Sequence, residues 1–584
     1  MAVDTRKKLL FFSPHTGIWE HAFPEALLAE SLMKSGHDIY YVTCGEVFKN
    51  HCEAMSAVQM GHDATLEKKS RVCAQCQFQG DLLRHNLQLP GCRLADVLSE
   101  TDLTWAQANL SAAPDEGFDD YLVDGMPVGR CALYALLLHA KKTDLNLNDE
   151  ERAIYRVELF NTLLSLAAAK KLVAQEKPDR VIVYNALHPV NHIFKQYVES
   201  LGIPCYALNA SANLAHRLQF ISLTRGVDVF AQQIEAWPRY RKISAGPVQM
   251  ANAIDHFATT ILGERRATLS ISHEMAGDLR VRFGVPGGAK VLVATMSSYD
   301  ERFAAETVGA IDDFAGRLIF DRQVDWIAAV IEYVADRPDL FFIVRVHPRE
   351  FRGVISQHAT ALETLFNKLP TNVRINWPTD EISLFDLAEI TDVFLNAWST
   401  AGKEMGLLGM PVVLYSRHLV FYPADLNYVG DTSRADYFDQ IERALSEGWR
   451  AERIVKTFRW YALEHHWSQF DLEESYPLPE DTLLGTKGRQ RLMGVANAAE
   501  ARLDVYHRTP RLRQADLLSA VMEQGADSLL AIVEPESFRT TTADQELKLA
   551  RAQIGRLLSR WHGNGVPTSL SGLFVRLYSF ANGN

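Results

Sequence analysis

The segment "LLFFSPHTGIWEHAFPEALLAESLMKSGHDIYYVTC" (residues 9–44) joins two apolar runs through a loop and one helical stretch. The helical stretch begins near a proline and stops at Ser35-Gly36. This order of strand, helix and strand predicts two neighbouring parallel strands. A nucleotide-binding turn at this place would contain glycines, whereas this loop contains His15 and His21. The first turn therefore lacks the usual fingerprint of a phosphate site.

The same alternation of short apolar runs and longer helical stretches continues along most of the chain. It predicts an α/β fold with two Rossmann-like, doubly wound parallel sheets that face a cleft. A strongly amphipathic helix is expected over residues 150–177. The expected strands of the first sheet are 8–12, 38–43, 180–185, 204–209 and 227–232, and those of the second are 289–298, 339–348, 372–378, 392–400 and 410–416.

We accordingly divide the chain into three parts. Residues 1–270 are expected to form a first α/β domain with a cysteine-containing, loop-rich insertion at about 44–130. Residues 285–485 are expected to form a second α/β domain, and "RFGVPGGAK" (282–290) is a hinge between the two. A helical tail is expected over 486–584.

Composition and charge exclude several classes of function. The 584 residues have a formal net charge of -12, which argues against binding the phosphates of nucleic acid. No apolar run approaches the roughly 18 to 20 residues that cross a bilayer. The start of the chain is too short and too quickly interrupted for a secretory signal. We expect a cytoplasmic protein, with peripheral attachment to the inner face of the membrane as an alternative.

Seven cysteines lie in the first part of the chain, and five of them fall between residues 44 and 92. Their odd number and the expected location argue against a disulfide framework. A structural zinc or iron–sulfur site is one interpretation of the cluster, and incidental buried thiols are the other. The candidate ligands are Cys44, Cys52, Cys73 and Cys76.

The second half contains two features suited to phosphate chemistry. In "FFIVRVHPRE" (341–350), His347 follows an apolar strand, Pro348 ends that strand, and Arg349 adds positive charge. In "DVFLNAWSTAGKEMGLLGMPVVLY" (392–415), Ser399 and Thr400 fall at the expected start of a helix, where N–H groups favour an anion.

Two more residues complete the predicted nucleotide site. Glu404 lies one turn into the helix, where its carboxylate would accept hydrogen bonds from both ribose hydroxyls. Ser297, at the end of the unit's first strand, joins the same set. Each feature also has a structural interpretation, namely a His-Pro turn and an N-capped helix with a solvent-facing Glu.

These residues resemble the nucleotide-binding half of GT-B glycosyltransferases. The second segment is similar to "S-x-G-x-E-x-x-x-x-G-x-P-V" of bacterial capsule and surface-polysaccharide transferases. The "HP" after a strand is similar to the motif of capsule sialyltransferases and 3-deoxy-manno-octulosonate (Kdo) transferases, and of teichoic-acid glycerophosphotransferases. The resemblance implies a CMP- or CDP-linked donor, with His347, Ser399 and Thr400 at its phosphate and Glu404 at its ribose. The acidic base motif of sialyltransferases has only "PDEG" (114–117) as a counterpart here.

An inverting transfer also needs a base on the opposite unit. "HAFPEALLAESLMKSGHDIYYVT" (21–43) resembles the "GHxxPxxxLAxxLxxxGHxVxxxT" start of glycosyltransferases that act on small-molecule and lipid acceptors, and His21 falls on their catalytic histidine. Because Glu20 replaces the glycine, Glu20, His15 and Glu25 stay as rivals.

Polar side chains beyond the strand at 180–185 suit an acceptor sugar. The candidates are Asn185, His188 and His192.

The predicted function is an inverting, metal-independent glycosyltransferase of bacterial surface-polysaccharide biosynthesis. The expected partners are a nucleotide-sugar donor and a glycan or lipid-linked glycan acceptor, and no cofactor is expected to be required. The alternatives are a CDP-polyol phosphotransferase, a nucleotide-sugar epimerase or hydrolase, and a non-catalytic sugar-binding assembly subunit.

Overall fold

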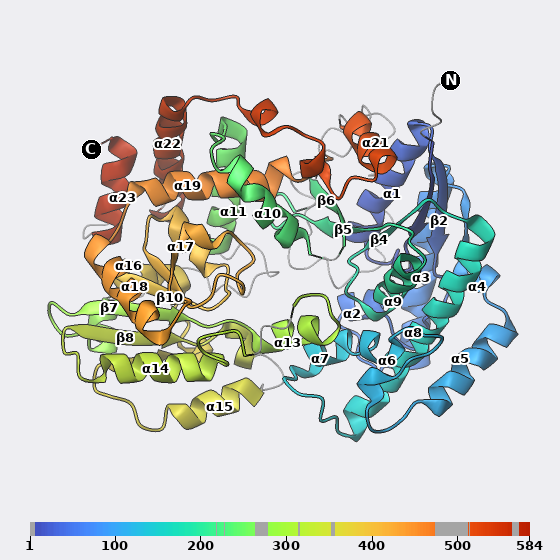
Figure 1. Cartoon of the computed structure of the whole chain (residues 1–584), viewed down its shortest axis with the longest axis horizontal. Helices are drawn as coiled ribbons and strands as arrows, with labels where there is room; N and C mark the ends of the chain where they lie inside the picture. Colours follow the sequence, from blue (N-terminus) through green and yellow to red (C-terminus); the bar gives the residue numbers. More distant parts are fainter. Residues whose placement is uncertain are drawn as a thin grey trace.

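Two sheets of buried strands organise the molecule, one in each half of the view in Figure 1. The computed structural model describes residues 6–217, 219–226, 228–262, 278–312, 316–351, 357–472, 512, 514–562 and 572–583.

The first sheet has the strand order β13-β6-β5-β4-β1-β2-β3. All its pairs are parallel except those that β6 makes with β5 and with β13. Its strands are β1 Lys8–Phe12, β2 Asp38–Thr43, β3 Gly91–Arg93, β4 Arg180–Tyr184, β5 Cys205–Ala210, β6 Phe220–Arg225 and β13 Phe470–Asp471.

The second sheet has the order β12-β11-β10-β7-β8-β9 and is parallel throughout. Its strands are β7 Lys290–Thr295, β8 Leu340–Arg345, β9 Val373–Asn376, β10 Val393–Asn396, β11 Val412–Leu414 and β12 Tyr428–Val429. The predicted α/β fold with two doubly wound, mainly parallel sheets is therefore confirmed.

Helices cover both faces of each sheet, because successive side chains of a strand point to opposite faces. In β1, Leu10 and Phe12 join one apolar cluster while Leu9 and Phe11 join another. The helices of the first unit are α1 Trp19–Lys34, α2 Glu53–Ala57, α3 Leu66–Asn86, α4 Leu94–Val97, α5 Glu100–Ala112, α6 Val128–Cys131, α7 Tyr134–Ala140, α8 Asp149–Glu176 and α9 Pro189–Ser200. The next helix, α10 Val229–Tyr240, packs in the core cluster of the second sheet.

The helices around the second sheet come from three stretches of sequence. They are α11 Pro247–Leu262, α12 Leu279–Phe283, α13 Tyr299–Thr307, α14 Gln323–Ala335, α15 Gln357–Leu365, α16 Leu384–Ile390, α17 Ala401–Leu407, α18 Arg434–Glu447, α19 Ala451–Ala462, α22 Ala543–His562 and α23 Gly572–Asn582. A π-helical turn, Leu463–Trp467, continues α19.

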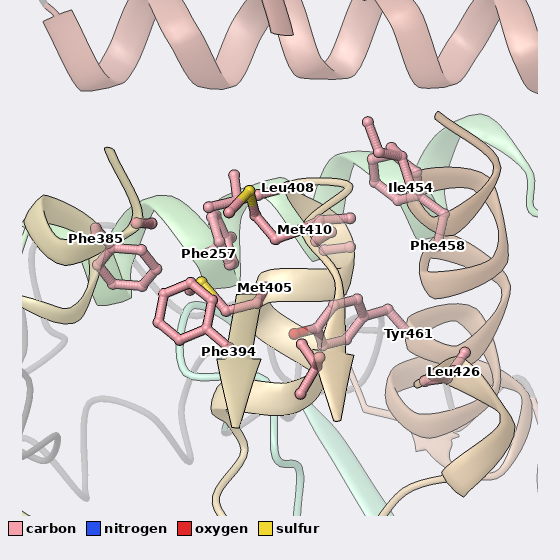
Figure 2. Packing of buried hydrophobic residues seen from close by; sticks show 14 of the residues in the cluster. Phe257, Phe385, Phe394, Met405, Leu408, Met410, Leu426, Ile454, Phe458 and Tyr461 are labelled. Atoms are coloured by element: carbon pink, nitrogen blue, oxygen red, sulfur yellow. The ribbon is translucent and has the colours of Figure 1, made fainter. Parts of the chain in front are cut away.

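One core cluster joins these distant stretches. Figure 2 shows Phe257 of α11, Phe394 of β10, Met405 of α17 and Phe458 of α19 gathered in it. Helix α22 packs on α11 and α23, so the end of the chain completes the same layer. Helix α21, Ala515–Gln524, packs instead on α1 of the first unit (Figure 1).

Several predicted elements differ from the structure. Residues 227–232 were expected to be a strand, but α10 begins at Val229, because the Asp228 side chain accepts hydrogen bonds from the N–H groups of Phe230 and Ala231. The stretch from 44 to 130 contains the 21-residue helix α3 and also β3, which pairs with β2. The helix predicted at 150–177 is confirmed as α8. Residues 486–511 of the predicted tail lie outside the described residues.

Among the described helices, none combines the length and the apolar character that a membrane span requires.

The contact between α17 and α19 gives a test of the packing under the candidate site. A Cβ added at Gly406 would lie 2.7 Å from the Thr457 hydroxyl, which has no hydrogen-bond partner among the described residues. We expect Gly406→Ala to cost about 1–3 kcal/mol through overpacking. Thr457→Ala in the same chain should restore stability, because the other Thr457 side-chain atoms lie 3.9 Å away. Thermal melting of both single variants and the double variant checks this, and two additive losses would contradict it.

Candidate active site

Each sheet has a point at which the direction of strand addition reverses. In the second sheet it lies between β7 and β10, and in the first between β1 and β4. Ligands of open α/β sheets bind beyond the carboxyl ends of the strands at such points. The loops after β7, β8 and β10 and those after β1 and β4 contain most of the predicted site residues.

His347 lies directly beyond β8, and its ring orientation is fixed. Its Nδ1 accepts a hydrogen bond from the N–H of Arg349 at 3.3 Å and lies 3.1 Å from the Ser298 hydroxyl. A backbone N–H only donates, so Nδ1 holds the lone pair and Nε2 bears the proton of the neutral ring. No described residue makes a hydrogen bond to Nε2, which is thus a donor open to a ligand.

The charges around His347 are mainly positive. Burial, followed by the charges of Arg345, Arg349 and Lys141, lowers the pKa of His347 to about 3. The imidazole is therefore neutral near pH 7 and offers a hydrogen bond rather than a proton. A bound anion would be attracted by the same cations that keep the ring neutral.

The side chains of Arg345 and Arg349 have different partners. Arg345 is buried and donates to Asn376 Oδ1 at 2.6 Å and to the Ile382 carbonyl at 2.7 Å, so it does not point to a solvated face. The Arg349 guanidinium pairs with Asp300 at 2.7 Å and also donates to the Leu138 carbonyl of the first unit at 2.9 Å. Arg349 thus links the two units beside the candidate phosphate site.

The predicted serines and threonine lie on neighbouring loops. The Ser297 hydroxyl accepts the N–H of Trp398, which joins the loop after β7 to the loop after β10. The Ser399 hydroxyl accepts the N–H of Ala401 at 3.2 Å, while Thr400 is exposed and donates to Glu404 at 2.8 Å. Burial raises the pKa of Glu404. Helix α17 has only seven residues, so the hydroxyls rather than a helix dipole are the groups to consider here.

In the first unit, the predicted base His21 lies in the first turn of α1, next to Glu20. Its ring stacks on Tyr184 with 4.1 Å between centroids. Burial, followed by the charges of His188, Arg217 and His15, lowers its pKa to about 3. Burial likewise lowers the pKa of His15 to about 4. Both rings are therefore weak bases.

His188 has the opposite character. Its Nδ1 lies 2.8 Å from Glu53 Oε1, in an ion pair that is mostly buried. Burial lowers the pKa of His188, but the carboxylates of Glu53 and Glu158 together outweigh burial, so the net pKa is raised. Burial alone would raise the pKa of Glu53, yet His188 and further histidines lower it to about 2. The two groups are at ion-pair distance, but Nδ1 makes no hydrogen bond of normal geometry to a described residue, so Glu53 acts on the ring through its charge.

The two other predicted acceptor-side residues have structural partners. Asn185 adopts a left-handed backbone with φ +49°, and its Oδ1 accepts the N–H of Leu187 in the turn after β4. His192 is buried, with Nδ1 2.9 Å from the Ala186 carbonyl and Nε2 3.1 Å from the Val308 carbonyl of the second unit. His192 therefore lies in the contact between the units.

The cysteines of the predicted metal site line one cavity. They are Cys44, Cys52, Cys73 and Cys76. Burial raises the pKa of all four thiols. Within the described part of the chain, the one group of three or more His, Cys, Asp or Glu side chains with ligand atoms within 4.8 Å of each other is His51, His62 and Glu158.

Sequence reasoning missed two residues that complete these arrangements. Glu53 begins α2 inside the stretch taken for an insertion, and Ser298 directly follows a residue that was named. Tyr134 of α7 lies between the units, with its ring 5.9 Å from that of His188. Burial raises the pKa of Tyr134 to about 12, and the negative charges of Glu301 and Glu53 add to this effect. Glu53 belongs to the first unit and Glu301 to the second, so the acceptor-side residues of the first unit lie near the second unit at Tyr134.

Glu25, a rival for the role of base, is buried in α1. Burial raises its pKa to about 8, against a hydrogen bond with Ser13 that lowers it. The Ser13 hydroxyl also accepts the hydroxyl of Tyr41 at 3.0 Å. Glu25 is therefore largely protonated at neutral pH and is a poor candidate for the base.

Comparisons with known proteins find distant structural neighbours. No protein-family model matches the chain, and no curated protein matches its sequence. The UDP-GlcNAc 2-epimerase of Neisseria meningitidis is 11% identical over 79% of this chain and 96% of its own, with a TM-score of 0.26. KpsC of Thermosulfurimonas dismutans, a β-Kdo 2,4 transferase, is 15% identical over 49% of this chain and 80% of its own, with a TM-score of 0.30. The glycosyltransferase SnogD of Streptomyces nogalater is 14% identical over 79% and 96%, with a TM-score of 0.22.

The TM-scores of these neighbours lie below 0.5, so we base the fold on the strand order and the function on the geometry of the site.

The raised pKa of Glu25 predicts a pH dependence of stability. Between the unfolded value of 4.5 and the folded value of about 8, the folded chain holds a proton that the unfolded chain has lost. Stability from this group therefore falls as pH rises through that window, by up to about 1.4 kcal/mol per pH unit. Glu25→Gln should remove this slope, so its melting temperature relative to wild type should rise from pH 5.5 to pH 7.5. Glu20→Gln in the same helix is the control, and parallel melting curves for Glu25→Gln and wild type would contradict the assignment.

Proposed function

We propose that the chain is a glycosyltransferase that moves a sugar from a nucleotide-activated donor to an acceptor hydroxyl, with inversion and without a catalytic metal. The observation that supports this best is His347, a neutral imidazole with a free Nε2–H among cations, beyond the end of β8 and one strand from the reversal point of the second sheet. The glycosyltransferase motifs in the sequence support the same reaction class.

On the donor side, Nε2–H of His347 would donate to a phosphate oxygen next to the scissile bond. The hydroxyls of Ser298, Ser399 and Thr400 lie on the adjoining loops and would rotate towards the same phosphate. As the sugar–oxygen bond breaks, its electron pair stays on the phosphate oxygen. The cations around His347 then offset the added negative charge.

On the acceptor side, we assign the base to His188, paired with Glu53. A general base works best with a pKa near the working pH, and the raised pKa of His188 suits this better than the lowered pKa of His21. The acceptor oxygen would bond to the anomeric carbon while its proton passes to Nε2 of His188. His15 on the loop after β1 and His21 in the first turn of α1 would contact the acceptor.

For the donor sugar, the acceptor and the pathway, the proposal rests on the sequence resemblance. We propose a CMP-linked acidic sugar as donor, a glycan or lipid-linked glycan as acceptor, and surface-polysaccharide synthesis at the cytoplasmic side of a bacterial membrane. Product analysis separates the alternatives. Transfer to a glycan supports this proposal, an epimerised nucleotide sugar supports an epimerase, and release of CMP with a polyol phosphate on the acceptor supports the phosphotransferase.

The donor site predicts a nucleotide-dependent rise in melting temperature. Wild-type protein should be stabilised by one of CMP, CDP, UDP or GDP more than by the others. His347→Ala should weaken that binding by about 10- to 100-fold, because a hydrogen bond to a charged group contributes about 1.5–3 kcal/mol. His85→Ala, an exposed histidine on α3, should bind as wild type does. A failure of all four nucleotides to shift the melting temperature would refute the donor site.

The assignment of the base predicts a split between chemistry and binding. His188→Asn should lower kcat by about 100-fold or more while nucleotide binding stays unchanged. Glu53→Gln should lower kcat less and should move the acidic limb of the kcat/KM profile to lower pH, because loss of the carboxylate lowers the pKa of His188. Glu158, which also raises the pKa of His188, stays in place in this variant.

His21→Asn is the matched comparison and should retain more activity than His188→Asn. An inactive His21→Asn enzyme together with an active His188→Asn enzyme would return the role of base to His21.

A further inference from the structure

A second polar cluster lies beside the His188–Glu53 pair. His51 precedes α2, His62 precedes α3, and Glu158 lies in α8. Glu158 Oε1 lies 3.3 Å from His51 Nδ1 and 3.0 Å from His62 Nε2. The two rings stack with 3.5 Å between centroids. His51 and Glu158 are 5% and 4% exposed, so solvent does little to screen this contact.

The hydrogen bonds of His51 determine which of its ring nitrogens faces Glu158. His51 Nε2 lies 3.1 Å from the Met60 carbonyl, which only accepts, so Nε2 bears a proton. In the neutral ring, Nδ1 then holds a lone pair that points at a carboxylate oxygen. Two lone pairs at 3.3 Å repel each other unless a proton or a cation lies between them.

We propose that His51 Nδ1, His62 Nε2 and a Glu158 oxygen bind one divalent transition-metal ion, with zinc as the first choice. Two imidazoles and one carboxylate are a common ligand set for zinc. In a tetrahedral site with bonds of about 2.05 Å, neighbouring ligand atoms lie roughly 3.3 Å apart. The contacts of 3.0 and 3.3 Å match this spacing, and all three ligand atoms lie within 4.8 Å of one another.

The surroundings of the ligands also fit a metal site. A ligating histidine usually donates its other N–H to a carbonyl or carboxylate, as His51 does to Met60. The backbone at the two histidines is held as well, since Asn161 donates to the His51 carbonyl at 2.9 Å and Lys69 to the His62 carbonyl at 2.6 Å. The His62 side chain is 15% exposed and provides a route of entry.

The position of the site indicates that the ion would stabilise the structure. The ion would fasten the segment 51–62 to α8, and this segment contains Glu53, the partner of His188. The assignment of the site does not rest on the proposed sugar transfer, and the three ligands are different residues from those around His347. The site also differs from the cysteine-lined cavity, because its donors are nitrogen and oxygen.

Metal binding by the full chain tests the proposal. Protein stripped with a chelator is titrated with Zn²⁺ against a chromophoric competitor, and about one equivalent should bind and raise the melting temperature. His62→Ala and Glu158→Gln should each weaken binding by about 100-fold or more, while His85→Ala and the double variant Cys73→Ser/Cys76→Ser should bind as wild type does. His62 is partly exposed, so His62→Ala should fold; its metal-free melting curve verifies this.

Cobalt substitution identifies the donor atoms. Co²⁺ should give the visible bands of a nitrogen–oxygen site without a strong thiolate-to-metal band in the near ultraviolet. Three results would overturn the proposal: no stoichiometric binding, binding that His62→Ala leaves intact, or a thiolate band that disappears in Cys73→Ser/Cys76→Ser. Nucleotide binding at His347 is measured in parallel, and its presence or absence has no bearing on the metal result.

Discussion

The Arg349 guanidinium is the interaction on which the candidate site most depends. It pairs with Asp300 in its own unit and donates to the Leu138 carbonyl of the other unit. The N–H of the same residue donates to His347 Nδ1 and so directs the Nε2–H outward. Because Arg349 is half buried and ion-paired, this cation is held in place before a ligand arrives. The position of the two units and the orientation of the phosphate donor are thereby coupled.

The same coupling explains why the reversal points of the two sheets serve a single site. Parallel strands end at a common edge, so loops that are distant in sequence meet there. In the second unit the Ser297–Trp398 and Ser298–His347 contacts tie three such loops together. On the other side of the junction, His192 and Tyr134 link the loop after β4 and α7 to residues of the second unit. The two sheets thus act as a rigid scaffold that positions the site residues of the loops.

The sequence predicted most of the strands, because buried parallel strands are continuous apolar runs, and the structure places His347 and Ser399 beyond the ends of two of them. Prediction from the sequence failed where the outcome depends on contacts between residues that are distant in the chain or on a single capping side chain. Residues 227–232 have the apolar composition of a strand, yet a side-chain cap at Asp228 starts a helix. Glu53 is a single carboxylate in a region without periodicity, and only the fold brings it to His188. Burial, which no pattern of residue types specifies, lowers the pKa of His21 while Glu53 raises that of His188.

The loop after β1 shows why histidines replace glycines there. A glycine-rich turn binds phosphate through free backbone N–H groups. Here the N–H of Gly17 donates to Cys76 Sγ at 3.1 Å, and the N–H of Ile18 donates to the His15 carbonyl at 2.9 Å. A Cβ at Gly17 would lie 3.2 Å from that of Ala54, so the loop is also closely covered. The N–H groups of Gly17 and Ile18 are therefore occupied, one by α3 and one within the loop, and the histidine side chains of this strand end are the candidates for chemistry.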